Sequence, residues 1–69
     1  MPSIALAAPA VWAHALDTFG TEERAARWMR VPLAELGNRT PEEVLLNTLP
    51  DGEKAVEAIL ARIDYGVYS

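Results

Sequence analysis

The side chains with a potential for acid–base chemistry include two adjacent carboxylate pairs, Glu22 with Glu23 and Glu42 with Glu43. Paired carboxylates act as general acid and base when both reach one substrate molecule. Neighbouring residues in a helix point about 100° apart, so these pairs do not converge on a single atom. Each pair falls at the expected start of a helix, where the macrodipole favours negative charge. The pairs therefore indicate helix starts rather than an active site.

The chain has one histidine, His14, and no cysteine. A metal site needs several ligands at suitable spacing, and Asp17 is the one candidate near His14 in the sequence. A partly buried structural histidine is the alternative, and the sequence favours it. The two serines, Ser3 and Ser69, lie at the ends of the chain, away from any His–Asp arrangement. We therefore expect no enzyme, no cofactor and no bound metal.

The charge of the chain argues against nucleic acid as a direct partner. The formal net charge is -4 and the pI is about 4.7, whereas binding to phosphates requires clustered Lys and Arg. Arg24, Arg27 and Arg30 are spaced at three-residue intervals, but Glu22 and Glu23 precede them. This pattern is typical of a solvated helix face of mixed charge. A basic protein surface is a better partner for this chain.

The opening stretch MPSIALAAPAVWAHAL is apolar and resembles a signal peptide in composition. It has no basic n-region, Pro9 interrupts the apolar run, and cleavage after Ala15 would remove Trp12. The run is too short to span a bilayer. We expect a cytoplasmic protein that does not bind membranes.

The length of 69 residues allows a single domain with a marginal core of its own. Half of the residues are hydrophobic (51%), which favours a folded chain that borrows stability from a partner. We expect residues 1–9 to be flexible, and there is no room for a helix-turn-helix domain. The expected organisation is one domain over residues 1–69.

The hydrophobic periodicity is helical throughout and predicts an all-α fold, a small bundle of about four short helices with a projecting C-terminal tail. Helices are expected after Pro9, after the N-cap Thr21, in the capping box Thr40–Glu43 and after Asp51. Gly20 and the pair Gly37–Asn38 are expected to end helical segments. The inward-facing stripes are expected to contain Trp12, Ala15, Leu16, Phe19, Ala25, Trp28, Met29, Val44, Leu45, Leu46, Ala55, Val56, Ile59, Leu60 and Ile63. Trp12 and Trp28 are assigned to the core, with an interface role as the alternative.

Three segments in this order form a recognisable combination: FGTEERAARWM (19–29), LGNRTPEEVL (36–45) and GEKAVEAILARIDYGVYS (52–69). Together they resemble the toxin-binding C-terminal domain of the Xre/MbcA/ParS antitoxin family. Asn38 stands where a second glycine is frequent, and asparagine also adopts the left-handed conformation. Met29 replaces a usual leucine at similar volume. Many relatives also carry an N-terminal DNA-binding domain, so its absence argues against transcriptional repression by this chain.

The resemblance implies an antitoxin of a type II toxin–antitoxin system. Its partner would be a RES-domain toxin that consumes NAD, by degrading it or by transferring ADP-ribose to a target. The antitoxin would bind the toxin directly and cover its NAD site with the C-terminal end, possessing no catalytic activity itself. The implied toxin-binding residues are Arg62, Asp64, Tyr65, Gly66, Val67, Tyr68 and Ser69.

The C-terminal stretch allows two interpretations. In the first, Gly66 ends the last helix and Val67, Tyr68 and Ser69 project into the toxin pocket, with Asp64 and the Ser69 carboxylate at the anion positions. In the second, Tyr65 and Val67 fold back as a hydrophobic cap on the helix. The resemblance favours the first for Tyr68 and Ser69, with Tyr65 serving both the domain and the interface.

The apolar stripes exceed what one small core covers, so we expect burial against a toxin subunit in a complex of two toxin and two antitoxin chains. Two other functions are the alternatives to the antitoxin. One is a structural or self-associating helical module, and the other is a transcriptional co-regulator without its own DNA-binding domain.

Overall fold

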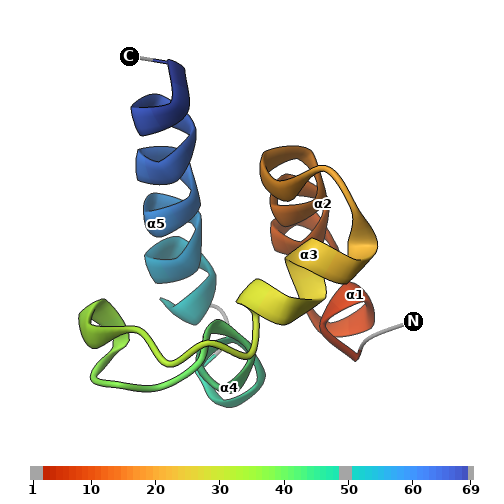
Figure 1. Ribbon diagram of the computed structural model, residues 1–69. Coiled ribbons are helices and arrows are strands. Elements are labelled where there is room, and N and C mark those ends of the chain that lie inside the picture. The colour runs from red at the N-terminus through yellow and green to blue at the C-terminus, as the bar shows by residue number, and fades with distance from the viewer. Residues whose placement is uncertain (1–2, 49–50, 69) are drawn as a thin grey trace.

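The computed structural model describes residues 3–48 and 51–68, and helices make up most of this part of the chain (Figure 1). The all-α prediction is confirmed. The elements in chain order are α1 (Ser3–Ala7), α2 (Pro9–Phe19), α3 (Glu22–Trp28), the 3-10 helix η1 (Ala34–Leu36), α4 (Pro41–Asn47) and α5 (Asp51–Tyr68).

The connection between α2 and α3 is built from the two residues that the sequence indicated. Gly20 has a left-handed φ of 87° and its amide donates to the Leu16 carbonyl, which ends α2. Thr21 then accepts a hydrogen bond from the Arg24 amide at 3.2 Å and starts α3. Both signals act within four residues, which explains why the sequence alone predicted this turn.

The capping box at the start of α4 is also present. The Thr40 hydroxyl accepts from the Glu43 amide at 3.1 Å, and Pro41 occupies the first turn. The Glu43 carboxylate turns back as expected, but its hydrogen bond comes from the Thr40 hydroxyl at 3.4 Å. α4 is therefore held at its start by the residues that the sequence assigned to this role.

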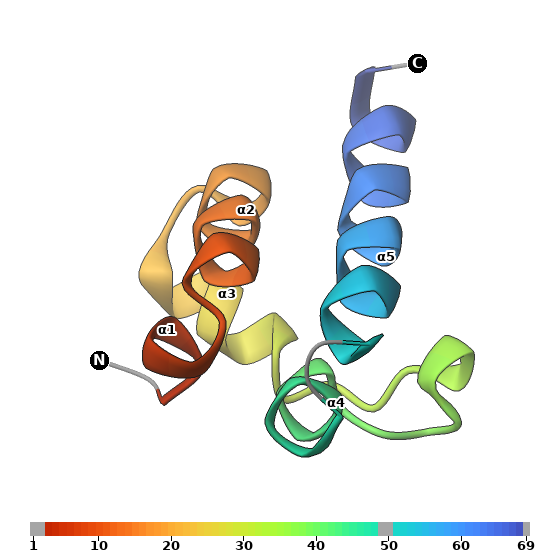
Figure 2. The same ribbon diagram turned by 180° about the vertical axis from the view of Figure 1, so that it is seen from behind.

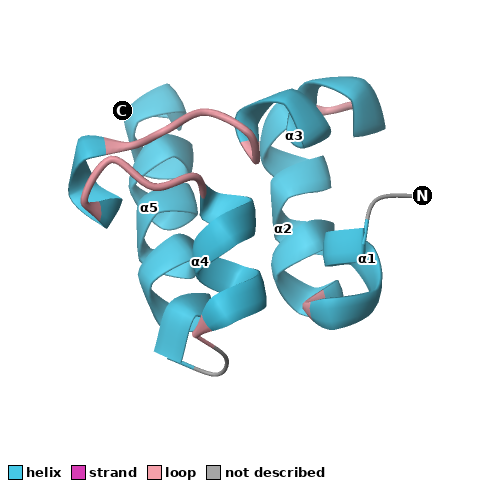
Figure 3. Cartoon of the chain, turned by 90° about the horizontal axis from the view of Figure 1, so that it is seen from below, coloured by secondary structure: helices cyan, strands magenta, loops and turns pink. Residues whose placement is uncertain are grey.

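The loops around η1 run side by side, as Figure 3 shows. The Leu33 amide donates to the Arg39 carbonyl at 3.1 Å, which closes the loop across η1. Gly37 and Asn38 both adopt left-handed conformations, with φ of 69° and 63°. The expectation that asparagine substitutes for a second glycine here is confirmed.

The core combines residues from every helix. α1 packs against α2 and α4, and α5 packs against α2 and α4. Trp12 is 6% exposed, so its assignment to the core is confirmed, whereas Trp28 is half-buried and lies against Phe19, with ring centroids 5.3 Å apart and ring planes tilted by 35°. The buried hydrophobic residues are Ile4, Ala8, Val11, Trp12, Ala15, Ala25, Met29, Leu36, Val44, Leu45, Val56, Ile59 and Leu60.

Several expectations from the sequence are wrong in detail. Flexibility was expected for residues 1–9; residues 1 and 2 lie outside the described part of the chain, and Ser3–Ala7 forms α1, with Ile4 1% exposed in the core. Leu46 was assigned to the inward face of α4 and is 45% exposed. Ala55 is likewise exposed on α5. In each case the direction of the side chain depends on how the short helix packs, which periodicity over one or two turns does not determine.

The most consequential difference concerns the C-terminal end. Gly66 was expected to end the last helix, yet α5 continues through it to Tyr68. Glycine tolerates helical as well as left-handed dihedral angles, and no proline follows to stop the helix. The C-terminal end is therefore the last turn of α5, and it lies far from α1 in both Figure 1 and Figure 2.

Candidate functional site

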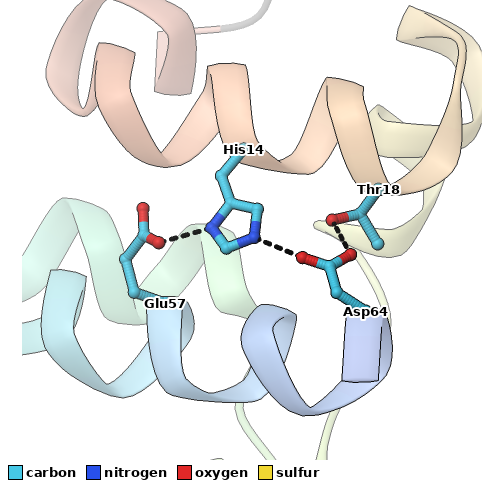
Figure 4. A network of polar contacts seen from close by, with 4 residues as sticks. All are labelled: His14, Thr18, Glu57 and Asp64. Carbon is cyan, nitrogen blue, oxygen red and sulfur yellow. Dashed lines mark hydrogen bonds and ion pairs between the residues drawn. The ribbon is translucent and has the colours of Figure 1, made fainter. Parts of the chain in front are cut away.

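A polar network joins α2 to α5, and its centre is the imidazole ring of His14 (Figure 4). The Nδ1 atom of His14 lies 2.5 Å from Oε2 of Glu57, and its Nε2 atom lies 2.7 Å from Oδ2 of Asp64. Glu57 and Asp64 are two turns apart, so both project from the same face of α5. The ring therefore bridges two turns of α5 at once.

The geometry of this bridge favours the protonated form of His14. Ionised carboxylates only accept hydrogen bonds, so both ring nitrogens of His14 must donate, as they do in the imidazolium form. The hydrogen bond to Asp64 and then that to Glu57 raise the pKa of His14 above 6.5. Both carboxylates thus favour the charged ring, although the His14 side chain remains 24% exposed.

Asp64 is held from a second side as well. Its Oδ1 atom accepts from the Thr18 hydroxyl at 2.7 Å, while Oδ2 faces His14. Thr18 follows His14 by one helical turn, so the two residues lie on the same face of α2. The bond from Thr18, followed by that from His14, lowers the pKa of Asp64 below 3.8. We call His14, Thr18, Glu57 and Asp64 the His14 network.

The contacts of the His14 network were not predicted from the sequence. His14 was expected to be partly buried and structural, which fits its place in the structure, but its partners were not identified. Glu57 was not among the residues expected to face inward, yet it contacts Nδ1 of His14. The available signal was the spacing of the polar residues. His14 and Thr18 are four residues apart on α2, and Glu57 and Asp64 are seven residues apart on α5. Such a signal is weak without knowledge of which helices pack together.

The residues assigned to toxin binding separate into two groups. Arg62 and Asp64 already have partners within the domain, because Arg62 pairs with Glu35 and Asp64 belongs to the His14 network. Tyr65 is 79% exposed, and Gly66 is exposed in the next position. Ser69 and the side chains of Val67 and Tyr68 lie outside the described part of the chain. For Asp64 to occupy an anion position in the toxin's pocket, its hydrogen bonds with Thr18 and His14 would have to break.

A shallow groove lies beside Arg62, on the side of α5 that faces α3 and η1. Its volume is about 280 Å³, and its lining residues are Trp28, Leu33, Glu35, Ile59, Arg62 and Ile63. The ion pair between Arg62 and Glu35 contributes the charged part of this lining. The groove has no convergent set of catalytic side chains, so it offers surface for contact rather than chemistry.

The described residues offer no metal centre. The two nitrogens of His14 face different carboxylates in different directions, and no group of three or more potential ligands converges in residues 3–48 and 51–68. Asp17, the second ligand considered from the sequence, is exposed. Within these same ranges, no helix is long and apolar enough to cross a membrane.

The sequence of this chain is similar to one family of known proteins. Residues 14–66 match the model of the antitoxin Xre/MbcA/ParS C-terminal toxin-binding domain. The chain is 39% identical over 57 residues to a protein named Antitoxin Xre from Photorhabdus laumondii subsp. laumondii, and the alignment covers 81% of this chain. It spans only 37% of the length of that relative. No solved structure gave a significant match.

Proposed function

Because this chain belongs to the family of Xre/MbcA/ParS antitoxin C-terminal toxin-binding domains, we propose that it binds a toxin and neutralises it as the antitoxin of a toxin–antitoxin system. The observation that carries the proposal is the family match over residues 14–66, which reaches into the last turns of α5. The protein acts by binding and performs no catalysis. Its toxin is a RES-domain protein that consumes NAD.

The C-terminal end of α5 is the part of the domain that contacts the toxin at its NAD site. Tyr65 supports this proposal, because a large aromatic side chain that is 79% exposed next to a helix end is suited to a partner's pocket. A pocket that binds NAD must have apolar or aromatic walls for its rings, and a tyrosine ring fits between such walls. The net charge of -4 also favours approach to a site that attracts phosphates.

The internal partners of Arg62 and Asp64 refine the proposed contact surface. Their ion pairs and hydrogen bonds hold α5 to η1 and to α2, so their contribution is to support the helix end. Tyr65, Gly66 and the residues that follow them then make the contact. The helix presents these residues along one rigid axis, which lowers the entropy lost on binding compared with a flexible tail.

Co-expression with a RES-domain toxin of the proposed kind tests the proposal. We expect cells to regain growth, the two proteins to co-purify, and cellular NAD to return to its level without toxin. A chain with Ala58→Pro, which interrupts α5, is the matched control, since it should fail to rescue. Growth arrest in the presence of the intact, well-expressed chain would overturn the antitoxin function. Rescue with an unchanged NAD loss would overturn the proposed mode of action.

The proposed assembly is two toxin chains with two antitoxin chains. The exposed apolar side chains Leu6, Val31, Leu46 and Tyr65 support burial against another subunit. Light scattering of the co-purified proteins measures the mass of the complex. A mass that equals one copy of each chain would exclude the two-plus-two assembly without affecting the proposed inhibition.

A further inference from the structure

We propose that His14 is a positioning residue for toxin binding, which locks the C-terminal end of α5 onto α2 through Asp64 while both of its ring nitrogens carry protons. This inference rests on the proposed function and adds that the toxin affinity depends on pH. The toxin-facing end of α5 is held in its binding orientation when the His14 network is closed. It gains freedom, and the toxin affinity falls, when His14 loses one proton.

The distribution of contacts along α5 explains why a polar network has this role. Among the described side chains of α5, which run from Asp51 to Gly66, the buried apolar residues end at Leu60, Ile63 is only partly buried, and Tyr65 is exposed. Asp64 follows Ile63 and precedes Tyr65, and it is bonded to α2 twice, by His14 and by Thr18. Apolar packing therefore fixes the first turns of α5, whereas polar bonds restrain the turn from which Tyr65 projects.

The protonation of His14 decides whether its hydrogen bonds to Glu57 and to Asp64 form at the same time. We call these two bonds the arms of the bridge. A neutral imidazole has one N–H, so its second nitrogen presents a lone pair. In the observed geometry that lone pair would face a carboxylate oxygen of Glu57 at 2.5 Å or of Asp64 at 2.7 Å. Two acceptors at this distance repel each other, and one arm of the bridge must open.

The charges around His14 come mainly from α5. α5 faces the ring with Glu57 and Asp64, and on α2 itself Asp17 is exposed one turn further along. α1, which packs on α2, contains no ionisable side chain within Ser3–Ala7. α3 also packs on α2, and its charged residues are all exposed: Glu22, Glu23, Arg24 and Arg27. The two carboxylates of α5 are therefore the groups that oppose loss of the proton, in agreement with the raised pKa of His14.

The domain has the means to remain folded when the network opens. Val11, Trp12 and Ala15 of α2 belong to the same buried cluster as the apolar face of α5, and this cluster does not include His14. Opening the network thus removes restraint from the last turns without removing the core. For this reason, folding and toxin binding are expected to respond differently to pH.

The test measures toxin affinity across a pH series for the wild-type chain, His14→Gln and a control, Arg27→Gln. The probe is the purified RES-domain toxin that the chain neutralises in the co-expression experiment. Glutamine has one amide that donates and one oxygen that accepts, so it reproduces a single arm of the bridge at every pH. Arg27→Gln breaks the exposed ion pair with Glu23, away from the network.

We expect the toxin affinity of the wild type to fall about tenfold from the acidic to the alkaline side of the His14 titration. A fall of this size results when about a tenth of the molecules still hold the end of α5 in the binding orientation. His14→Gln should bind at the weakened level throughout, without this step, and Arg27→Gln should follow the wild type. Any titration of the toxin itself appears equally in all three profiles. Identical profiles for wild type and His14→Gln, with both folded, would overturn the inference.

A measurement on the free wild-type chain keeps the inference testable if His14→Gln does not fold or if no toxin binds. The imidazole nitrogens of His14 report its protonation by NMR, and the amide of Tyr65 reports the position of the helix end. We expect the Tyr65 amide to shift with the same midpoint as the His14 ring. A Tyr65 signal that is unchanged through this midpoint would overturn the positioning role. Absence of toxin binding at every pH would instead overturn the proposed function.

Discussion

Thr18 and Asp64 lie 46 residues apart in the chain, and the Thr18 hydroxyl donates a hydrogen bond of 2.7 Å to the Asp64 carboxylate. This bond helps to hold the C-terminal part of α5 against α2, because Asp64 simultaneously faces His14 with its other oxygen. Tyr65, the next residue, is consequently turned towards solvent with 79% of its surface exposed. The orientation of the helix end thus depends on side chains from both helices.

The stability of the domain should depend on pH through the titration of His14 and Asp64. The pKa of His14 is raised above 6.5 in the folded state, so its contribution is complete below pH 6.5 and is lost as the pH rises through the folded-state value. The pKa of Asp64 is lowered below 3.8, so its contribution is present above pH 3.8 and is lost as the pH falls through the folded-state value. The pair should therefore stabilise the domain most between pH 3.8 and pH 6.5.

Urea unfolding of the wild type and of His14→Gln, followed by circular dichroism across this range and up to about pH 9, measures the effect. The difference in the free energy of unfolding between the two proteins should shrink as the pH rises through the His14 titration. A difference that stays constant with pH would mean that His14 has the same charge in the folded and unfolded states.

Gly52 should not tolerate a methyl group. A Cβ atom at this position would lie 2.6 Å from the Val44 carbonyl oxygen and 2.6 Å from Oγ1 of Thr48, where α4 approaches the start of α5. Gly52→Ala should therefore destabilise the domain by about 1 to 3 kcal/mol, the usual cost of overpacking. The free energy of unfolding in urea provides the measurement. An unchanged value would show that α4 and α5 separate at little cost.

Gly66 should behave in the opposite way. It lies within α5, and a Cβ atom there would meet nothing within 4 Å. Gly66→Ala should raise the helical content and stabilise the domain by about 0.5 kcal/mol, because glycine is a poor residue for a helix interior. If Gly66 instead ended the helix in a left-handed conformation, alanine would destabilise it. Thermal unfolding of this variant thus tests the continuation of α5 to Tyr68.

Asn38 has a left-handed φ of 63°, directly after Gly37 with φ of 69°. Asn38→Val should cost about 1 to 2 kcal/mol, since a β-branched residue is strained in this conformation. Asn38→Gly is the matched control and should leave the stability nearly unchanged. Equal unfolding midpoints for both variants would contradict the need for left-handed dihedral angles in this loop.

Tyr65→Ala should separate toxin binding from folding. The side chain is 79% exposed, so its removal should leave the melting temperature unchanged. Toxin binding should weaken by about 2 kcal/mol, the typical loss for an aromatic anchor at an interface. Arg27→Ala is the control, because the Arg27 side chain is 73% exposed on α3 and lies outside the proposed contact surface. Calorimetry with the purified toxin gives both affinities, and equal losses would argue against a specific role of Tyr65.

Deletion of residues 67–69 should restore NAD turnover in the complex. The backbone of Val67 and Tyr68 continues α5, so the deletion shortens the helix by less than one turn and should change the stability little. The rest of the interface should still hold the toxin, because a few anchors carry much of the affinity and the remainder provides complementarity. Full silencing of the toxin by the shortened chain would show that the body of the domain covers the NAD site.

The sequence by itself determined the parts of the fold that depend on neighbours within a few residues. Thr21 and Thr40 cap their helices, Gly20 ends α2, and Asn38 adopts the left-handed conformation, all as their residue types predicted. Each of these interactions closes within three or four residues, so its energy is largely independent of the rest of the molecule. The all-α class followed from the same local signals and from helical periodicity.

Only the tertiary structure decided which polar side chains meet. His14 and Asp64 are 50 residues apart, and their contact requires the packing of α2 on α5 at one particular rotation. The expectation that Gly66 ends the last helix was wrong for a related reason, since glycine permits both a helical and a left-handed conformation at small cost. Gly66 is helical, so the backbone of α5 continues to Tyr68. Arg62 and Asp64 bond to other parts of the domain and hold this end of the helix in place. The residue types alone had indicated a free tail instead.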